Sequence, residues 1–401
     1  MLRTAMFCLA LLGAGLLLGQ PINGTVRVGL FHGKTVKDVL LMSDRGPADV
    51  LADGRRVGAI AATDGLRITA GTNGTLVAKS LKLAFSAAER IEIVPRRPDG
   101  GFRLKATGQN VPERRYPGPL QVDRSGGGLR LVATPALDDY VAGVVRAEAG
   151  NHHHIEYYKL QSVSCRTYAL SNLRKHLKDG FAVCDQVHCQ LFRGRNDNDT
   201  IAMAVAATHD LVIVDPAIRL IHATFHSNCG GETVNAEDVW SYEPYLRATT
   251  DTFCTHADQA TWERTFPRSE WLGYLRRKHG FTADGPAALA AVLEYEPQCR
   301  DLYLGNTTPL IPLKTVREDL KLRSTYFGIR TEGEKVVLQG RGFGHGVGLC
   351  QEGAMRMARA GRPYTGILHH YYTGVHLVEL GTLDFFREEE PVPGGDFPTG
   401  M

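Results

Sequence analysis

The pattern of hydrophobic and polar positions predicts strands in the first third of the chain. Val26, Val28 and Leu30 alternate with less apolar neighbours, which is the period of a half-buried strand. Turn signals such as Asn73-Gly74 and Gly126-Gly127 separate the later apolar runs. These further strand candidates are Arg67–Thr69, Ile91–Ile93, Phe102–Leu104 and Leu129–Val132. Residues 22 to 132 are therefore expected to be all-β.

The period changes to 3.6 after residue 133, which predicts a helix. Its apolar stripe consists of Leu137, Tyr140, Val141, Val144 and Val145. Thr134 is the expected N-cap, with Pro135 at the first helical position, and Gly150 is the expected end.

A single carboxylate, Glu148, lies on the apolar stripe of this helix. A carboxylate against an apolar face loses hydration, which raises its pKa and suits a general acid. The alternative is a glutamate that reaches solvent or pairs with an arginine. The helix pattern taken alone favours this alternative.

Further elements are predicted along the rest of the chain. A second helix is expected over residues 156 to 176, and shorter helices over 199–208, 271–279, 286–293, 313–320 and 351–360. Strands are expected over 211–214 and 221–225.

Glycine occupies every second position from Gly340 to Gly348. In an extended segment this leaves one bare face and places Phe343, His345 and Val347 on the other. The segment contains neither a Walker loop nor the Gly-x-Gly-x-x-Gly pattern of a dinucleotide site. Its bare face permits close approach of a ligand or of another part of the chain, and both alternatives stay open.

Composition and the first residues bound the class of protein. With 401 residues, 43% hydrophobic residues and a net charge of +3, the chain is typical of a soluble globular protein, and nothing indicates a nucleic-acid partner. Arg3 followed by the apolar run Phe7–Leu18 is typical of a signal peptide or N-terminal anchor. We therefore expect export to the periplasm, the cell wall or the outer side of a membrane.

Six motifs, in this order, resemble the stage II sporulation protein D family (SpoIID/LytB). They are Tyr116-Pro-Gly-Pro-Leu, Leu137 to Glu148, Lys159 to Leu170 around Arg166-Thr-Tyr168, Gln190-Leu-Phe-Arg-Gly194, Phe225-His-Ser-Asn-Cys-Gly-Gly-Glu-Thr233, and Gly342 to Ala354 around Gly-His-Gly-Val-Gly-Leu-Cys-Gln351. The chain departs from the family pattern at Ala149, at Arg146 and at His152-His153-His154, which we expect to form a solvated turn.

The resemblance implies an α+β fold in which a β-rich N-terminal part packs with a helical catalytic region and a mixed α/β segment. The expected organisation is a signal peptide or anchor (1–20), a β-rich part (21–132), a catalytic core (133–260), a mixed insertion (261–330), a glycine-rich motif and helix completing the core (331–386) and a disordered tail (387–401).

The resemblance also implies a lytic transglycosylase that cleaves peptidoglycan glycan strands, with Glu148 as catalytic acid/base. One carboxylate suffices for this reaction, because the muramic acid 6-hydroxyl attacks the anomeric carbon and leaves a 1,6-anhydro end. No cofactor is required. The expected substrate-binding residues are Arg166, Tyr168, Gln190, His226, Ser227, Gly230, Gly231, His345 and Gln351. Some have an alternative role: Arg166 and Tyr168 can instead orient Glu148, and Arg166 can satisfy helix ends or Asp138. His345 alone is more typical of a hydrogen-bonded structural histidine. The alternative is a non-catalytic peptidoglycan-binding protein or amidase enhancer, which acts with other cell-wall hydrolases.

The cysteines allow two interpretations. Cys184, His188 and Cys189 have metal-ligand spacing, with His176 as a fourth donor, and some members of the family carry a zinc bound by two cysteines and two histidines. Disulfides or buried thiols are the interpretation that we favour for an exported protein. A zinc at this place would be structural.

Overall fold

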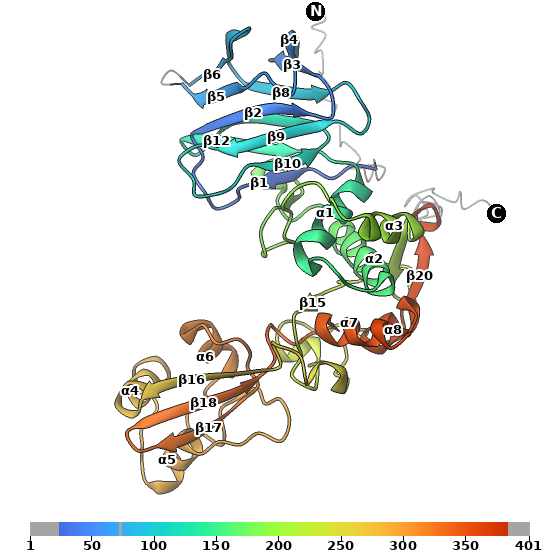
Figure 1. Cartoon of the computed structure of the whole chain (residues 1–401). Coiled ribbons are helices and arrows are strands. Elements are labelled where there is room, and N and C mark those ends of the chain that lie inside the picture. The colour runs from blue at the N-terminus through green and yellow to red at the C-terminus, as the bar shows by residue number, and fades with distance from the viewer. Residues whose placement is uncertain (1–23, 72–73, 384–401) are drawn as a thin grey trace, which may run out of the picture.

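The computed structural model describes residues 24–71 and 74–383 and has an α+β fold, as the sequence predicts (Figure 1). The N-terminal third forms two sheets. A seven-stranded sheet has the order β13-β1-β12-β11-β8-β3-β4, and a six-stranded sheet has the order β10-β9-β2-β5-β6-β7. The first comprises β1 (Val28–Leu30), β3 (Ala48–Ala52), β4 (Arg55–Ile60), β8 (Arg90–Pro95), β11 (Leu120–Ser125), β12 (Gly128–Ala133) and β13 (Val183–Cys184). The second comprises β2 (Asp38–Asp44), β5 (Leu66–Ala70), β6 (Leu76–Lys79), β7 (Ala84–Ala87), β9 (Gly101–Ala106) and β10 (Arg114–Pro117).

A helical region follows the sheets. It contains α1 (Leu137–Ala149), α2 (Ile155–Ser171) and α3 (Asp199–Ala207), and α2 packs against both of the others. The C-terminal helices α7 (Gln351–Arg359) and α8 (Tyr364–Tyr371) return to pack on α2. Strand β20 (His376–Glu379) then pairs with β14 (Leu211–Val214), so the two ends of this region are joined.

A third body comes between these two halves of the helical region in the sequence, and in space it lies at the end of the molecule away from the two large sheets (Figure 1). Its sheet has the order β16-β18-β17, made of β16 (Thr261–Pro267), β17 (Phe327–Glu332) and β18 (Lys335–Arg341). Helices α4 (Arg268–His279), α5 (Pro286–Leu293) and α6 (Leu313–Leu320) belong to it, and it has its own hydrophobic cluster around Trp271. The sheet runs on to Arg341, so the expected boundary between 330 and 331 falls inside β17.

Several predicted element limits are wrong. Helix α1 begins at Leu137 without a side-chain cap, so Thr134 and Pro135 lie before it, whereas Gly150 ends it with φ 74° as expected. Helix α2 ends at Ser171 and not at 176. Of the strand expected over 221–225, only Phe225 is in a strand, β15 (Phe225–His226).

The glycine-rich segment is not extended as predicted. Gly342, Gly344, Gly346 and Gly348 all have positive φ, between 71° and 122°, a region that favours glycine. The segment is therefore a loop between β18 and the short strand β19 (Leu349–Cys350).

The expected signal peptide or anchor (1–20) and disordered tail (387–401) lie outside the described residues. Within the described part of the chain, no helix combines the length and apolar character needed to cross a membrane.

Candidate active site

Glu148 lies in the last turn of α1, where the apolar stripe predicted from sequence is buried. Its Oε1 accepts a hydrogen bond of 2.7 Å from the backbone N–H of Leu191. Burial raises the pKa of Glu148, while the Leu191 N–H and the charge of Arg193 oppose the shift. Glu148 thus favours its protonated form more than a solvated glutamate does, as a general acid requires.

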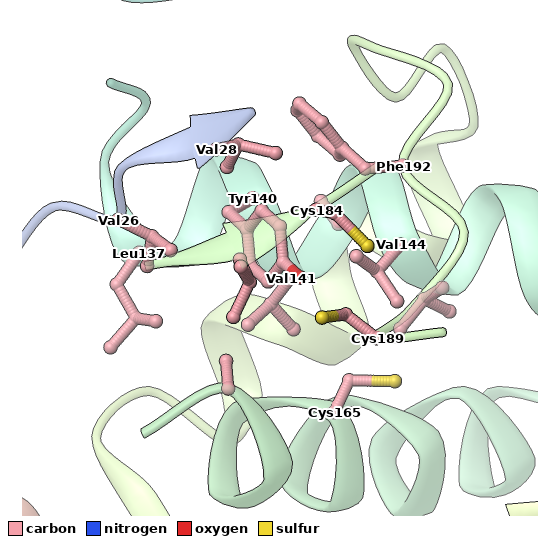
Figure 2. Packing of buried hydrophobic residues seen from close by; sticks show 14 of the residues in the cluster. Val26, Val28, Leu137, Tyr140, Val141, Val144, Cys165, Cys184, Cys189 and Phe192 are labelled. Atoms are coloured by element: carbon pink, nitrogen blue, oxygen red, sulfur yellow. The ribbon is translucent and has the colours of Figure 1, made fainter. Parts of the chain in front are cut away.

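The segment from Cys184 to Gly194 positions Glu148, because it crosses α1 closely. A Cβ at Gly143 would lie 2.3 Å from the Gly194 carbonyl oxygen and 2.5 Å from the Phe192 ring. Glycine at 143 therefore permits the crossing. Gln190 is buried here, and its Oε1 accepts a hydrogen bond of 3.2 Å from the Tyr140 hydroxyl. Figure 2 shows Tyr140, Phe192 and the sulfurs of Cys184 and Cys189 together beside α1.

The four metal-ligand candidates named from sequence do come together. One donor atom each of His176, Cys184, His188 and Cys189 lies within 4.8 Å of the others. His176 Nε2 is 3.2 Å from His188 Nδ1, and His176 Nδ1 is 2.7 Å from the Asp179 carboxylate. A carboxylate on the second ring nitrogen is typical of a metal-binding histidine. The donor set and its spacing therefore fit a zinc ion.

Tyr168 lies beside this cluster and near Glu148, since the charges of Cys189, Cys184 and Glu148 add to burial in raising its pKa. Its hydroxyl accepts a hydrogen bond of 3.3 Å from Lys175 Nζ. The side chain is half-buried, so part of it remains open to a substrate.

Of the alternatives for Arg166, the structure favours the pair with Asp138 over substrate binding, because the Arg166 side chain is fully buried. The guanidinium pairs with Asp138 at 2.8 Å and donates to the carbonyl oxygens of Thr208 and Leu211 at 2.8 and 3.1 Å. Arg166 joins α1, α2 and the end of α3 and presents no surface to a ligand.

A second group of predicted residues lies around β15, β19 and the start of α7, and no hydrogen bond found among the described residues joins it to Glu148. Figure 1 shows β15 between α2 and the third body. The group comprises His226, Ser227, Gly230, Gly231, His345 and Gln351.

Both histidines of this group contact backbone carbonyl oxygens, and His226 Nδ1 lies 3.2 Å from that of Val347. His345 Nε2 lies 3.0 Å from the Phe225 carbonyl oxygen, and its Nδ1 accepts from the Val347 N–H at 3.1 Å. Burial lowers the pKa of His345 to about 4 and that of His226 well below its ordinary value. The neutral His345 ring thus has both nitrogens engaged with backbone, as a structural histidine does.

Gly230 packs against the start of the glycine-rich loop, whereas a Cβ at Gly231 would lie 3.6 Å from Thr255. Gly230 has φ 76°, and a Cβ there would lie 2.7 Å from the Arg341 side chain. A Cβ at Gly342 would lie 2.6 Å from the Asn228 carbonyl oxygen. The sequence left open whether a ligand or another part of the chain approaches the glycine-rich segment. At Gly342 it is another part of the chain. The expected substrate contact at Gly230 stays a prediction.

Arg193 was not singled out from the sequence, although it stands inside the Gln190–Gly194 motif. Its side chain is 39% exposed, and its charge acts on Glu148. An exposed cation beside an acidic catalytic candidate can hold an anionic group of a substrate. Its position directly before the glycine of that motif was the available signal.

Two cavities among the described residues lie away from Glu148. One, of about 680 Å³, is lined by β16, β17 and β18 and the Tyr295–Pro297 segment. The other, of about 250 Å³, lies between Trp240, Arg300 and His345. Neither is lined by Glu148.

The fold and the site define an α+β protein with one half-buried carboxylate held by a cysteine- and histidine-rich loop. A family model described as stage II sporulation protein matches residues 125–214, which contain Glu148 and this loop. Stage II sporulation protein D of Bacillus amyloliquefaciens is 28% identical over 260 residues, covering 61% of this chain and 74% of the relative. The chain is therefore similar to the stage II sporulation protein family over residues 125–214, and to stage II sporulation protein D over 61% of its length.

Two further relatives are similar over comparable lengths. An uncharacterized protein of Brachyspira hyodysenteriae is 28% identical over 270 residues, 64% of this chain and 69% of its own length. A Bacillus subtilis protein named amidase enhancer is 27% identical over 286 residues, 59% of this chain and 40% of its own.

Proposed function

We propose that the protein acts on the cell wall outside the cytoplasm, as a lytic transglycosylase that cleaves peptidoglycan glycan strands. The observation that carries the proposal is Glu148, a half-buried carboxylate with a raised pKa and one backbone donor. Similarity to this family over residues 125–214, together with relatives named for sporulation and for amidase enhancement, supports a cell-wall role.

In this mechanism Glu148 first protonates the oxygen that bridges two sugars. The resulting carboxylate then accepts the proton of the muramic acid 6-hydroxyl as that oxygen attacks the anomeric carbon. The products are a shortened strand and a 1,6-anhydro end, and no water is consumed. The Leu191 N–H, at 2.7 Å, stabilises the carboxylate between the two proton transfers.

A two-carboxylate hydrolase is less compatible with α1. Two-carboxylate glycosidases place their groups about 5 to 9.5 Å apart. The other acids of α1, Asp138 and Asp139, are in its first turn, and ten residues of helix span about 15 Å. Asp138 is also engaged by Arg166.

We propose in addition that His176, Cys184, His188 and Cys189 hold a structural zinc. The ion would supply no chemistry to the cleavage step. Two of its ligands, His188 and Cys189, come shortly before Leu191, whose N–H meets Glu148, so an ion held there would fix the position of the acid.

Similarity to the protein named amidase enhancer favours a second candidate function, a non-catalytic protein that binds peptidoglycan and assists other cell-wall hydrolases. The two functions differ in whether the protein itself makes new anhydro ends.

The test incubates wild type and Glu148→Gln with purified glycan strands, with and without stem peptides, and detects anhydro ends by mass spectrometry. We expect cleavage by wild type and a loss of about 10²- to 10⁴-fold in Glu148→Gln. Glu334→Gln, which changes an exposed glutamate of the third body, is the matched control and should cleave normally. Strand binding without cleavage by wild type would establish the second function instead.

A further inference from the structure

A second cluster of metal-ligand side chains lies outside the segment that the family model matches. Cys229 follows β15, Asp251 and Cys254 belong to the short turn at Thr252–Cys254, and Cys350 caps the start of α7. One donor atom of each lies within 4.8 Å of the others, and all four side chains are fully buried.

The spacing of the donors suits a tetrahedral ion. Cys229 Sγ lies 3.3 Å from Cys254 Sγ and 3.4 Å from Asp251 Oδ2. Zinc at about 2.3 Å from its sulfur ligands places them about 3.8 Å apart. Small side-chain adjustments therefore bring the donors to ligand distances. One disulfide would use two of the three sulfurs and leave a thiol and a carboxylate buried together.

Backbone N–H groups point at the sulfurs. Cys350 Sγ accepts from the N–H of Cys229 at 3.3 Å and from that of Gly353, in the first turn of α7, at 3.4 Å. Donors of this kind stabilise a thiolate, which is the form that binds metal.

Asp251 is a buried carboxylate without a cation. Its Oδ2 accepts from the Tyr371 hydroxyl at 2.8 Å and its Oδ1 from the Phe253 N–H at 3.0 Å. No lysine, arginine or histidine of the described residues forms an ion pair with it. Buried charges are normally paired or coordinate a metal, and the hydrogen bonds orient the carboxylate toward Cys229 and not toward solvent.

We propose that Cys229, Asp251, Cys254 and Cys350 bind a structural Zn²⁺ ion. Four protein ligands and full burial leave no open position for substrate, as in structural zinc sites. The thiols that are protonated release their protons to solvent on binding, and no electron transfer is involved. The site is independent of Glu148 and of the transglycosylase proposal.

An ion at this site would hold together the two chain segments that lead into and out of the third body. The chain enters the third body after Ala260 and leaves it at Gly342, whose N–H donates to the Ala260 carbonyl at 2.8 Å. Cys229 and Cys254 precede this excursion and Cys350 follows it. The ion therefore joins segments before and after the third body at its base.

The experiment measures metal in the full chain, purified under reducing conditions without chelators. In a Cys184→Ser/Cys189→Ser background, which disables the His176 cluster, we expect one equivalent of zinc by mass spectrometry. Adding Cys350→Ser should remove it, whereas adding Cys299→Ser, at an exposed cysteine outside both clusters, should not. Cobalt substitution should give thiolate charge-transfer bands and the visible spectrum of a tetrahedral site, and Cys350→Ser should abolish them.

Two further measurements do not depend on the folding of a cysteine variant. Asp251→Asn keeps the shape of the side chain and should lose zinc to a chelator at least about tenfold more readily. In wild type, alkylation after denaturation in chelator without reductant should label Cys229, Cys254 and Cys350 completely. A Cys229–Cys254 disulfide in that peptide map, or a Cys184→Ser/Cys189→Ser protein that is folded and free of zinc and cobalt, would overturn the proposal.

Discussion

The carboxyl group of Glu148 accepts one hydrogen bond and is largely removed from water, and this sets the expected pH dependence of the proposed cleavage. The general acid must be protonated, so kcat/KM should fall as pH rises through the raised pKa of Glu148. The alkaline limb should therefore lie above the range of an ordinary glutamate. A profile measured with glycan strands checks this, and an activity that is flat across that limb would contradict the assignment.

The free energy of unfolding should also depend on pH through Glu148, and the direction of the change can be stated. Because burial raises the pKa of folded Glu148 above its unfolded value, its contribution is present at acidic pH and is lost as pH rises through the folded pKa. Glu148→Gln should thus be more stable than wild type at neutral pH, with the difference shrinking at low pH. Urea unfolding at neutral and at low pH measures this difference in the free energy of unfolding, with Glu334→Gln as control.

Because Arg166 is buried, we expect its replacement to lower the free energy of unfolding and not to remove a substrate contact. Replacing it by Met leaves the carbonyl oxygens of Thr208 and Leu211 without their donor and Asp138 without its buried partner. Asp138 is 32% exposed and keeps His209 as a partner, so the main cost is that of the two carbonyl oxygens, about 1 to 3 kcal/mol for each buried acceptor left unpaired, measured by chemical denaturation. The double variant Arg166→Met/Asp138→Asn should cost less than the sum of the two single changes. Strict additivity would show that the pair does not act as a unit.

At the scale of elements, α1 depends on how closely the Cys184–Gly194 segment can approach it. Gly143→Ala would place a methyl group against the Gly194 carbonyl and the Phe192 ring, at a cost of about 1 to 3 kcal/mol. The displaced segment would carry the Leu191 N–H away from Glu148, so cleavage should fall more than binding. The matched control is Gly366→Ala in α8, where the nearest atom to the new methyl is 3.7 Å away. That change should stabilise slightly and leave cleavage intact.

At the scale of the whole molecule, two separate hydrophobic clusters predict two units of stability. Trp271 is buried in the cluster of the third body, and its Nε1 donates to the Val292 carbonyl at 2.9 Å. Trp271→Ala should cost that body about 3 to 5 kcal/mol. Hydrogen exchange should show faster exchange in β16, β17 and β18, with α1 and α2 unchanged. Leu160→Ala, in the larger cluster, should give the reverse pattern, and equal effects on both parts would mean that they unfold together.

The sequence by itself determined the elements whose residues repeat with a clear period. The apolar stripe of α1, with Glu148 at its end, and the helices α5 and α6 were predicted because side-chain periodicity is a local property. The ends of α1 and α2 were less well predicted, because Thr134 does not cap and the second helix stops at Ser171. Caps and helix ends depend on what packs beside them.

Only the tertiary structure decided the roles that depend on contacts between distant residues. Arg166 looked like a ligand-binding cation, and its burial between Asp138 and two carbonyls made it structural. The glycine-rich loop looked extended, yet positive φ angles and the approach of residues 228–231 made it a tight loop. Cys229, Asp251, Cys254 and Cys350 show no ligand spacing in the sequence, because a site built from separate segments exists only once the chain has folded.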